Sequence, residues 1–295
     1  MCVLSNFTKN CPAFAKRYSP GLYHRPVILG LLQVSLGARV MAFLAVFLLV
    51  GASLAGMVGL SGIETESPST PTKDDDIQNG TDGDDTLSGH SGNDVLIGWD
   101  GADALLGDGG NDWLLGLDGN DQLAGGDGAD VLIGGKGQDT VLGGDGGDFV
   151  ESANIVDETA LIASLDGAEK LGDIVFSYAL PGPSDDGDLA DLGPGDDTIV
   201  AGSDESVTGG SGTDEFALGD WIEDGRPVVI EDFDIAEDLI SFVHAGDQPT
   251  PDLSLEMDTQ TGMTSIKADG QTVAVLRNAS PDFSLRNVAV GRYAA

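Results

Sequence analysis

The chain has little cysteine, few basic residues and few aromatic residues. Its two cysteines, Cys2 and Cys11, both lie near the amino terminus, so no disulfide can cross-link the rest of the chain. Lys and Arg number 13 against 50 Asp and Glu, which gives a formal net charge of −37. A surface this acidic repels nucleic acids and anionic lipids and attracts divalent cations. We therefore expect no nucleic-acid partner.

Motifs of common enzyme classes are also missing. The three histidines, His24, His90 and His244, lie far apart in the sequence. The sequence contains no H-E-x-x-H zinc motif, no G-x-S-x-G nucleophile elbow and no phosphate-binding loop. We therefore predict that the chain is not an enzyme.

A nine-residue repeat occupies residues 80–151, eight times in succession and without an insertion. Gly stands at positions one and four of every unit, and Leu or Val stands at position eight. Positions one to six are too rich in glycine for a helix and indicate a turn, and positions seven to nine indicate a short strand. The middle residue of that strand, at position eight, faces the core. Position six is always aspartate: Asp85, Asp94, Asp103, Asp112, Asp121, Asp130, Asp139 and Asp148.

The aspartate column indicates a bound cation. Neighbouring β-strands lie about 4.8 Å apart, and two carboxylates at that spacing repel by roughly 1 kcal/mol in water and by more when buried. A divalent cation between them reverses the sign of the interaction. Carboxylate and carbonyl oxygens, with no Cys or His ligand set nearby, favour Ca²⁺ over Mg²⁺. The Leu/Val column is too small a core to order the block alone, so we expect calcium binding and folding to be one event.

The pattern G-G-x-G-x-D-x-U-x resembles the RTX (haemolysin-type) family of calcium-binding nonapeptide repeats. The resemblance implies an all-β fold, a right-handed parallel β-roll in which two nonapeptides form one coil and each residue stacks on the one eighteen positions away. It also implies that the position-six aspartates are calcium ligands. Residues 192–217 contain degenerate repeats, which add Asp197 and Asp214 as candidate ligands. These two are seventeen residues apart, so a shared ion there requires a local adjustment.

The segments before the block predict export. Residues 1–39 form a basic tail, and Met41 is an alternative start of the chain. Residues 40–63 contain no charged residue and suit a hydrophobic helix, which is either a membrane anchor or a cleaved signal segment. Because the bases precede this helix, the positive-inside rule puts everything after it outside the cytoplasm. We expect a secreted or extracytoplasmic protein, with residues 64–79 as a linker.

The segments after the block are less regular. Residues 152–191 predict an irregular insert with a short helix capped by Asp157. The degenerate repeats of residues 192–217 follow. Residues 218–295 predict an antiparallel β cap over the end of the roll, with Asp269-Gly270 as a hairpin turn.

An apolar stripe is expected on the outer face of one sheet, where the position-seven residues of the even-numbered repeats are Val95, Trp113, Val131 and Phe149. Either residues 156–180 cover this face, or it binds a second copy or another protein.

Three functions stay open at this point. The leading one is a structural or surface protein that is exported and folds on binding extracellular calcium. The others are an adhesion module that uses the apolar face, and a secreted hydrolase with an unrecognised site in residues 152–295.

Overall fold

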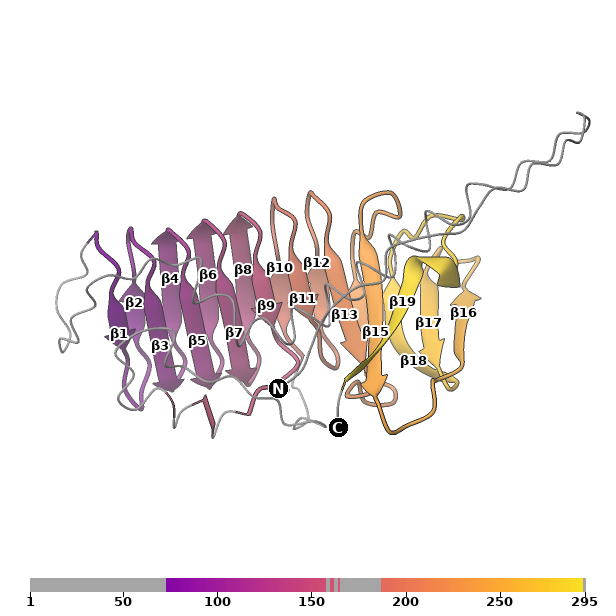
Figure 1. Cartoon of the computed structure of the whole chain (residues 1–295), viewed down its shortest axis with the longest axis horizontal. Coiled ribbons are helices and arrows are strands. Elements are labelled where there is room, and N and C mark those ends of the chain that lie inside the picture. The colour runs from indigo at the N-terminus through magenta and orange to yellow at the C-terminus, as the bar shows by residue number, and fades with distance from the viewer. Residues whose placement is uncertain (1–72, 158–159, 162–163, 165–186, 294–295) are drawn as a thin grey trace, which may run out of the picture.

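A computed structural model of the chain describes residues 73–157, 160–161, 164 and 187–293. These residues form two long β-sheets that face each other along the long axis of the molecule (Figure 1). The nine-stranded sheet has the order β1 (Ile77–Asn79), β3 (Val95–Asp100), β5 (Trp113–Asp118), β7 (Val131–Lys136), β9 (Phe149–Glu151), β11 (Thr198–Val200), β13 (Glu215–Gly219), β15 (Leu239–Ala245) and β19 (Val288–Tyr293). The ten-stranded sheet has the order β16 (Leu253–Met257), β17 (Thr264–Ala268), β18 (Gln271–Leu276), β14 (Val228–Ile230), β12 (Ser206–Thr208), β10 (Leu189–Asp191), β8 (Thr140–Asp145), β6 (Gln122–Asp127), β4 (Ala104–Gly109) and β2 (Thr86–Ser88).

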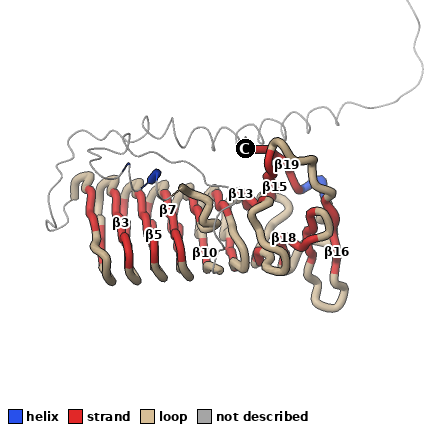
Figure 2. Tube along the Cα trace, turned by 90° about the horizontal axis from the view of Figure 1, so that it is seen from below, coloured by secondary structure: helices blue, strands red, loops and turns tan. Residues whose placement is uncertain are grey.

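Successive strands of the repeat block alternate between the two sheets, so two nonapeptides make one coil (Figure 2). Val95 pairs with Trp113, and Ala104 pairs with Gln122, each in a parallel register of eighteen residues. The expected stacking is thereby confirmed. Strands β3 to β8 are six residues long, twice the predicted length. They continue into positions one to three of the next unit because those residues still pair with the neighbouring coil, as Trp99 does with Leu117.

The position-eight column forms the interior of the roll, as predicted. Seven of its eight side chains are at most 1% exposed: Leu96, Leu105, Leu114, Leu123, Leu132, Val141 and Val150. The column continues past the block with Ile199, Val207 and Phe216, which belong to the same buried cluster. One apolar column therefore runs through the regular and the degenerate repeats alike.

Two positions of the unit have left-handed backbone. The position-four glycine has it in every unit after the first, for example Gly110 with a φ of 139°. Position two also does so, although it carries non-glycine residues in the early units: His90 (72°), Trp99 (80°), Asp108 (71°) and Leu117 (80°). Gly at position one is absent from the left-handed set, so positive φ does not explain that column.

The roll continues across the insert. Strand β10 pairs with β8, and β11 pairs with β9, both in parallel. The roll therefore resumes at Leu189, three residues before the predicted start of the degenerate repeats. Within the described part of the insert, the predicted cap is present: Ala160 N–H donates to Asp157 Oδ1 (3.1 Å), and Leu161 N–H donates to Asp157 O (2.9 Å).

The prediction of an antiparallel cap is wrong for most of residues 218–295. Strands β14, β15, β18 and β19 all pair in parallel with the preceding coil. Only β16, β17 and β18 pair antiparallel with one another. Asp269 and Gly270, with φ of 51° and 88°, form the predicted hairpin turn between β17 and β18. The apolar strands of the cap extend the interior column of the roll, which explains their parallel pairing.

The apolar outer stripe is covered by the chain itself. Val95, Trp113 and Val131 are each at most 4% exposed, and they form a second buried cluster with Val156 and Leu161 from the insert. The described part of the insert therefore covers this face, as one of the two interpretations expected. For these residues to bind a partner, Val156 and Leu161 would first have to leave the face.

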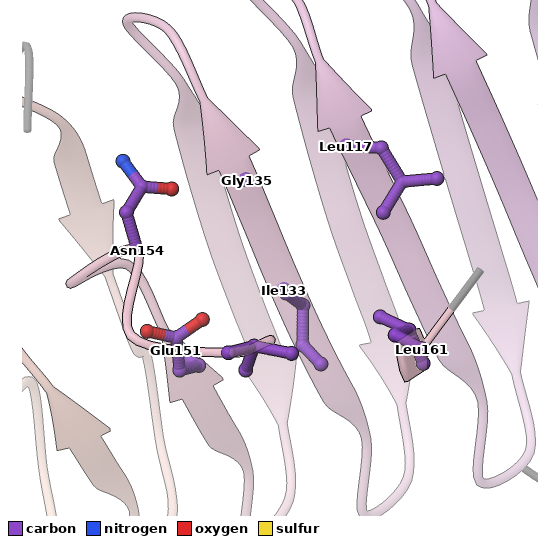
Figure 3. A pocket seen from close by; sticks show the side chains of 7 residues that line it. Leu117, Ile133, Gly135, Glu151, Asn154 and Leu161 are labelled. Atoms are coloured by element: carbon purple, nitrogen blue, oxygen red, sulfur yellow. The ribbon is translucent and has the colours of Figure 1, made fainter. Parts of the chain in front are cut away.

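A small cavity remains under this cover (Figure 3). It is lined by Leu117, Ile133, Gly135, Glu151, Asn154, Val156 and Leu161. The buried Glu151 carboxylate holds the turn beside it, since its Oε1 accepts N–H groups of Ala153 and Ile155, each at 3.1 Å.

The covered face makes a stability prediction with a matched control. Leu115 and Leu106 both stand at position nine, but Leu115 is fully buried and Leu106 is 40% exposed on the opposite sheet. We expect Leu115→Ala to lower the free energy of unfolding in calcium by about 2–5 kcal/mol, and Leu106→Ala by less than about 1 kcal/mol. Chemical denaturation monitored by circular dichroism measures both. Equal effects of the two substitutions would contradict the covered face.

Among the described residues, no helix has the length and the apolar character needed to cross a membrane. The hydrophobic helix predicted over residues 40–63 lies outside the described residues.

Candidate metal centre

The position-six aspartates form two hydrogen-bonded ladders. The backbone N–H of Asp85 donates to Oδ1 of Asp103 (2.7 Å), and the N–H of Asp103 donates to Oδ1 of Asp121 (2.8 Å). On the other sheet, Asp94 N–H donates to Asp112 Oδ1 (2.7 Å). Each aspartate directly precedes a strand, so one ladder runs along the strand starts of each sheet. The alternation of the column between two edges is as predicted.

The second carboxylate oxygen, Oδ2, takes no part in the ladder hydrogen bonds of most of these residues. Oδ2 is buried and has no hydrogen-bond partner among the described residues in Asp94, Asp103, Asp112, Asp121, Asp130, Asp148, Asp197 and Asp214. All eight residues are at most 3% exposed. A buried carboxylate oxygen without a partner is costly, so eight of them along the two ladders call for an opposite charge.

The position-one glycines make room beside these oxygens. A Cβ on Gly107 would lie against the carbonyl oxygen of Gly125 and 2.5 Å from Asp112 Oδ2. The same pair of groups, the aspartate of the unit and a carbonyl of the next coil, recurs beside Gly80, Gly89, Gly98, Gly116, Gly125 and Gly143. We call this space, bounded by the aspartate Oδ2 and the backbone carbonyl oxygen, a cradle, and any side chain at position one would fill it. This close approach explains the glycine at position one.

Burial raises the pKa of these carboxyl groups. Removal from water lifts the pKa of Asp112 and Asp197 to about 7, and the nearby aspartates of the same ladder add to the shift. Burial likewise raises the pKa of Asp94, Asp121 and Asp130 to about 6, against a hydrogen bond from the backbone that lowers it. The pKa values of Asp103, Asp148 and Asp214 shift in the same direction for the same reason. Without a cation, the folded ladders therefore resist full ionisation at neutral pH.

The donor set fits a hard cation. Among the described residues, no three His, Cys, Asp or Glu side chains converge on one point. Each cradle instead combines one carboxylate with backbone carbonyl oxygens of the neighbouring coil. Calcium accepts such mixed oxygen ligands at 2.3–2.6 Å and tolerates irregular geometry.

The other predicted residues extend the same ladders. Asp139 receives the N–H of Asp121 (2.8 Å) within the block. Across the insert, Asp148 N–H donates to Asp197 Oδ1 (2.7 Å). The bond from Asp197 N–H to Asp214 Oδ1 is 3.1 Å, longer than those within the block. The ladder therefore accommodates the spacing of seventeen residues by a slightly longer hydrogen bond.

Three further ladder members are not among the ligands predicted from the sequence. Asp76 N–H donates to Asp94 Oδ1 (2.6 Å), Asp139 N–H donates to Asp188 Oδ1 (2.8 Å), and Asp214 N–H donates to Asp238 Oδ1 (3.1 Å). Asp188 and Asp238 stand one residue before a strand and two before a buried apolar residue. That D-x-apolar signal survives where the glycines of the motif are lost.

Glu205 stands at the corresponding place before β12, where the repeat has aspartate. It is fully buried. Its carboxylate accepts the N–H of Gly202 (2.5 Å) and the hydroxyl of Ser152 (3.0 Å). At this coil, groups of the protein itself solvate the carboxylate.

Comparison with known proteins supports this assignment of the repeats. Residues 79–114 and residues 115–150 each match a family model described as RTX calcium-binding nonapeptide repeat (4 copies). Residues 79–150 thus match the RTX repeat family. The resemblance expected from the sequence is therefore confirmed for the repeat block.

Solved structures show weaker similarity. The AlgE6R3 subunit of the mannuronan C5-epimerase of Azotobacter vinelandii has 19% identity and a TM-score of 0.17, over 78% of this chain and 86% of that chain. The extracellular lipase LipA of Serratia marcescens has 17% identity and a TM-score of 0.22, over 77% of this chain and 40% of that chain. At these TM-scores, neither similarity informs the function. No curated protein matches the chain.

Proposed function

We propose that the two aspartate ladders bind calcium between successive coils and that the protein serves as a calcium-dependent structural or surface protein outside the cytoplasm. The observation that carries this proposal is the set of eight buried, unpartnered Oδ2 atoms along the two ladders, beside the glycine cradles. A cation at each cradle supplies the charge that these oxygens lack.

Calcium is favoured over magnesium by the construction of each cradle. Its oxygens belong to two different coils, with one aspartate and backbone carbonyls, as at Gly80. Magnesium demands near-ideal octahedral geometry at shorter distances and sheds its water reluctantly. The proposed ligands are Asp85, Asp94, Asp103, Asp112, Asp121, Asp130, Asp139, Asp148, Asp197 and Asp214.

Export is the second part of the proposal. The bases of residues 1–39 precede an uncharged stretch at residues 40–63, which would direct the acidic part out of the cytoplasm. Calcium is scarce in the cytoplasm and millimolar outside, so a chain that folds on calcium crosses the membrane before it folds. Residues 40–63 would then tether it or be removed.

A binding and structural role is preferred to a catalytic one, because the buried carboxylates are accounted for by the ladders. An adhesion role for the stripe at Val95, Trp113 and Val131 would require the insert to leave this face, where Val156 and Leu161 pack. A hydrolase would require a catalytic site in residues 152–295, and neither a sequence motif nor the aspartate ladders of this segment supply one.

A pair of glycines in β4 provides the test. A Cβ on Gly107 would enter the cradle, 2.5 Å from Asp112 Oδ2, whereas a Cβ on Gly109 would meet nothing nearer than 3.7 Å. We expect Gly107→Ala to lose about one equivalent of calcium and to raise the calcium concentration at the folding midpoint several-fold. Gly109→Ala removes the same backbone freedom from the unfolded chain but leaves the cradle open.

Calorimetric titration of the full-length chain gives the stoichiometry, and circular dichroism gives the midpoint. If Gly107→Ala and Gly109→Ala bind calcium like the wild type, the cradles are not the sites.

A further inference from the structure

Three side chains outside the aspartate ladders converge at the first coils of the ten-stranded sheet. The Ser88 hydroxyl donates to Asp108 Oδ2 (2.7 Å) and lies 3.2 Å from His90 Nδ1. His90 Nδ1 lies 3.5 Å from the same Asp108 oxygen. A hydroxyl oxygen, an imidazole nitrogen and a carboxylate oxygen therefore face one another within one small triangle.

His90 and Asp108 have left-handed backbone, although their side chains are not buried. His90 and Asp108 have φ of 72° and 71°, at a position where the later coils of this sheet carry glycine, as at Gly126 and Gly144. A non-glycine residue in this region costs about 1–2 kcal/mol. On the other sheet, the strained Trp99 and Leu117 pack into the second buried cluster. The side chains of His90 and Asp108 are instead 55% and 48% exposed, so burial does not offset their strain.

The triangle has the dimensions of a metal-binding face. Ligands about 2.1 Å from an ion lie about 3.4 Å from one another in tetrahedral coordination and about 3 Å apart in octahedral coordination. The three separations of 2.7, 3.2 and 3.5 Å bracket both values. The exposed position leaves the remaining coordination places to water. An imidazole nitrogen beside a carboxylate is a donor set that suits first-row transition metals rather than calcium.

We propose that Ser88, His90 and Asp108 form a binding site for a divalent first-row transition metal ion of the Zn²⁺ class, separate from the calcium ladders. His90 binds through Nδ1 in the tautomer that carries its proton on Nε2, and Asp108 supplies the neutralising charge. The Ser88 hydroxyl retains its proton and offers a lone pair.

The same residues do not form a proton relay. In a serine nucleophile site, the imidazole stands between the hydroxyl and the carboxylate and contacts them through different nitrogens. Here Ser88 bonds to Asp108 directly, and one nitrogen of His90 faces both. Convergence on a common point is the geometry of chelation.

Zinc titration of the full-length chain in saturating calcium tests the site. We expect one saturable Zn²⁺ site whose affinity falls at least tenfold in His90→Gly and in Asp108→Asn. Both variants keep the fold, since glycine occupies position two in later coils and asparagine tolerates left-handed backbone. Asp145→Asn, which removes an exposed charge from the same sheet, leaves the affinity unchanged.

Replacement of Zn²⁺ by Co²⁺ adds a spectroscopic readout. Visible absorption bands should report nitrogen coordination in the wild type and disappear in His90→Gly. Equal Zn²⁺ binding by the wild type and His90→Gly would overturn the proposal. So would Zn²⁺ binding that vanishes as calcium is raised, because the ion would then be in the ladders. Labelling of Ser88 by a phosphonate would overturn it in favour of a nucleophile.

Discussion

Removal of calcium from the full-length chain is expected to abolish most of its β circular dichroism signal and to expand the chain. The reason is electrostatic. Within each ladder, buried carboxylates such as those of Asp94, Asp112 and Asp130 follow one another on consecutive coils. Neighbouring carboxylates repel by roughly 1 kcal/mol in water and by several times more when partly buried, and the repulsion accumulates along the ladder. Bound calcium converts each of these repulsions into an attraction.

The measurement is circular dichroism together with small-angle scattering, first in a calcium chelator and then with calcium in excess. Calcium should restore the signal, while magnesium at the same concentration should restore little of it. A full β signal in the chelator at pH 8 would contradict the proposal that calcium binding and folding are coupled.

Acid is expected to substitute in part for calcium. Burial raises the pKa of Asp112 and Asp197 to about 7, and that of Asp94, Asp121, Asp130 and Asp214 to about 6, from an ordinary value of 3.8. Between about pH 4 and pH 6–7, the folded state without calcium binds more protons than the unfolded state. Stability therefore falls as pH rises through this window, by up to about 1.4 kcal/mol per pH unit for each group. The loss is complete above about pH 7.

A calcium-stripped chain should thus be unfolded at pH 8 and regain β structure near pH 4.5. With calcium present the dependence reverses below pH 7, because protons compete with the metal and raise the calcium concentration needed for folding. Asp112→Asn removes one titrating group, so it should flatten the transition, whereas Asp145→Asn, at an exposed position, should not. A calcium-stripped chain that folds equally at pH 4.5 and pH 8 would show that these carboxylates do not control the fold.

The regular part of the roll was predictable because every unit places the same residue types under the same local requirements. Gly at position four needs left-handed backbone, and Leu or Val at position eight needs burial. Asp at position six must face its neighbour one coil away. With three columns in phase, the coil length follows from the family resemblance, and so do the stacking of Val95 on Trp113 and the two aspartate ladders.

The irregular part was less predictable, because its contacts join residues that are far apart in the sequence. Asp188 enters the ladder through Asp139, forty-nine residues earlier, and its unit has lost the glycines that mark the motif. Asp238 enters through Asp214 in the same way. The strands after residue 218 lack the nine-residue motif, and the Asp269-Gly270 turn signal favoured an antiparallel interpretation. They pair in parallel because the open end of the roll presents a parallel edge and an apolar interior.

The order of residues alone was enough to specify the period, the buried column and the acidic ladders, since all of these are local properties repeated in each unit. The packing of distant segments settled the rest. It set Val156 and Leu161 over the apolar stripe and closed the ladders across the insert. These features depend on which surfaces meet in space, and a repeat pattern carries no information about partners outside its own period.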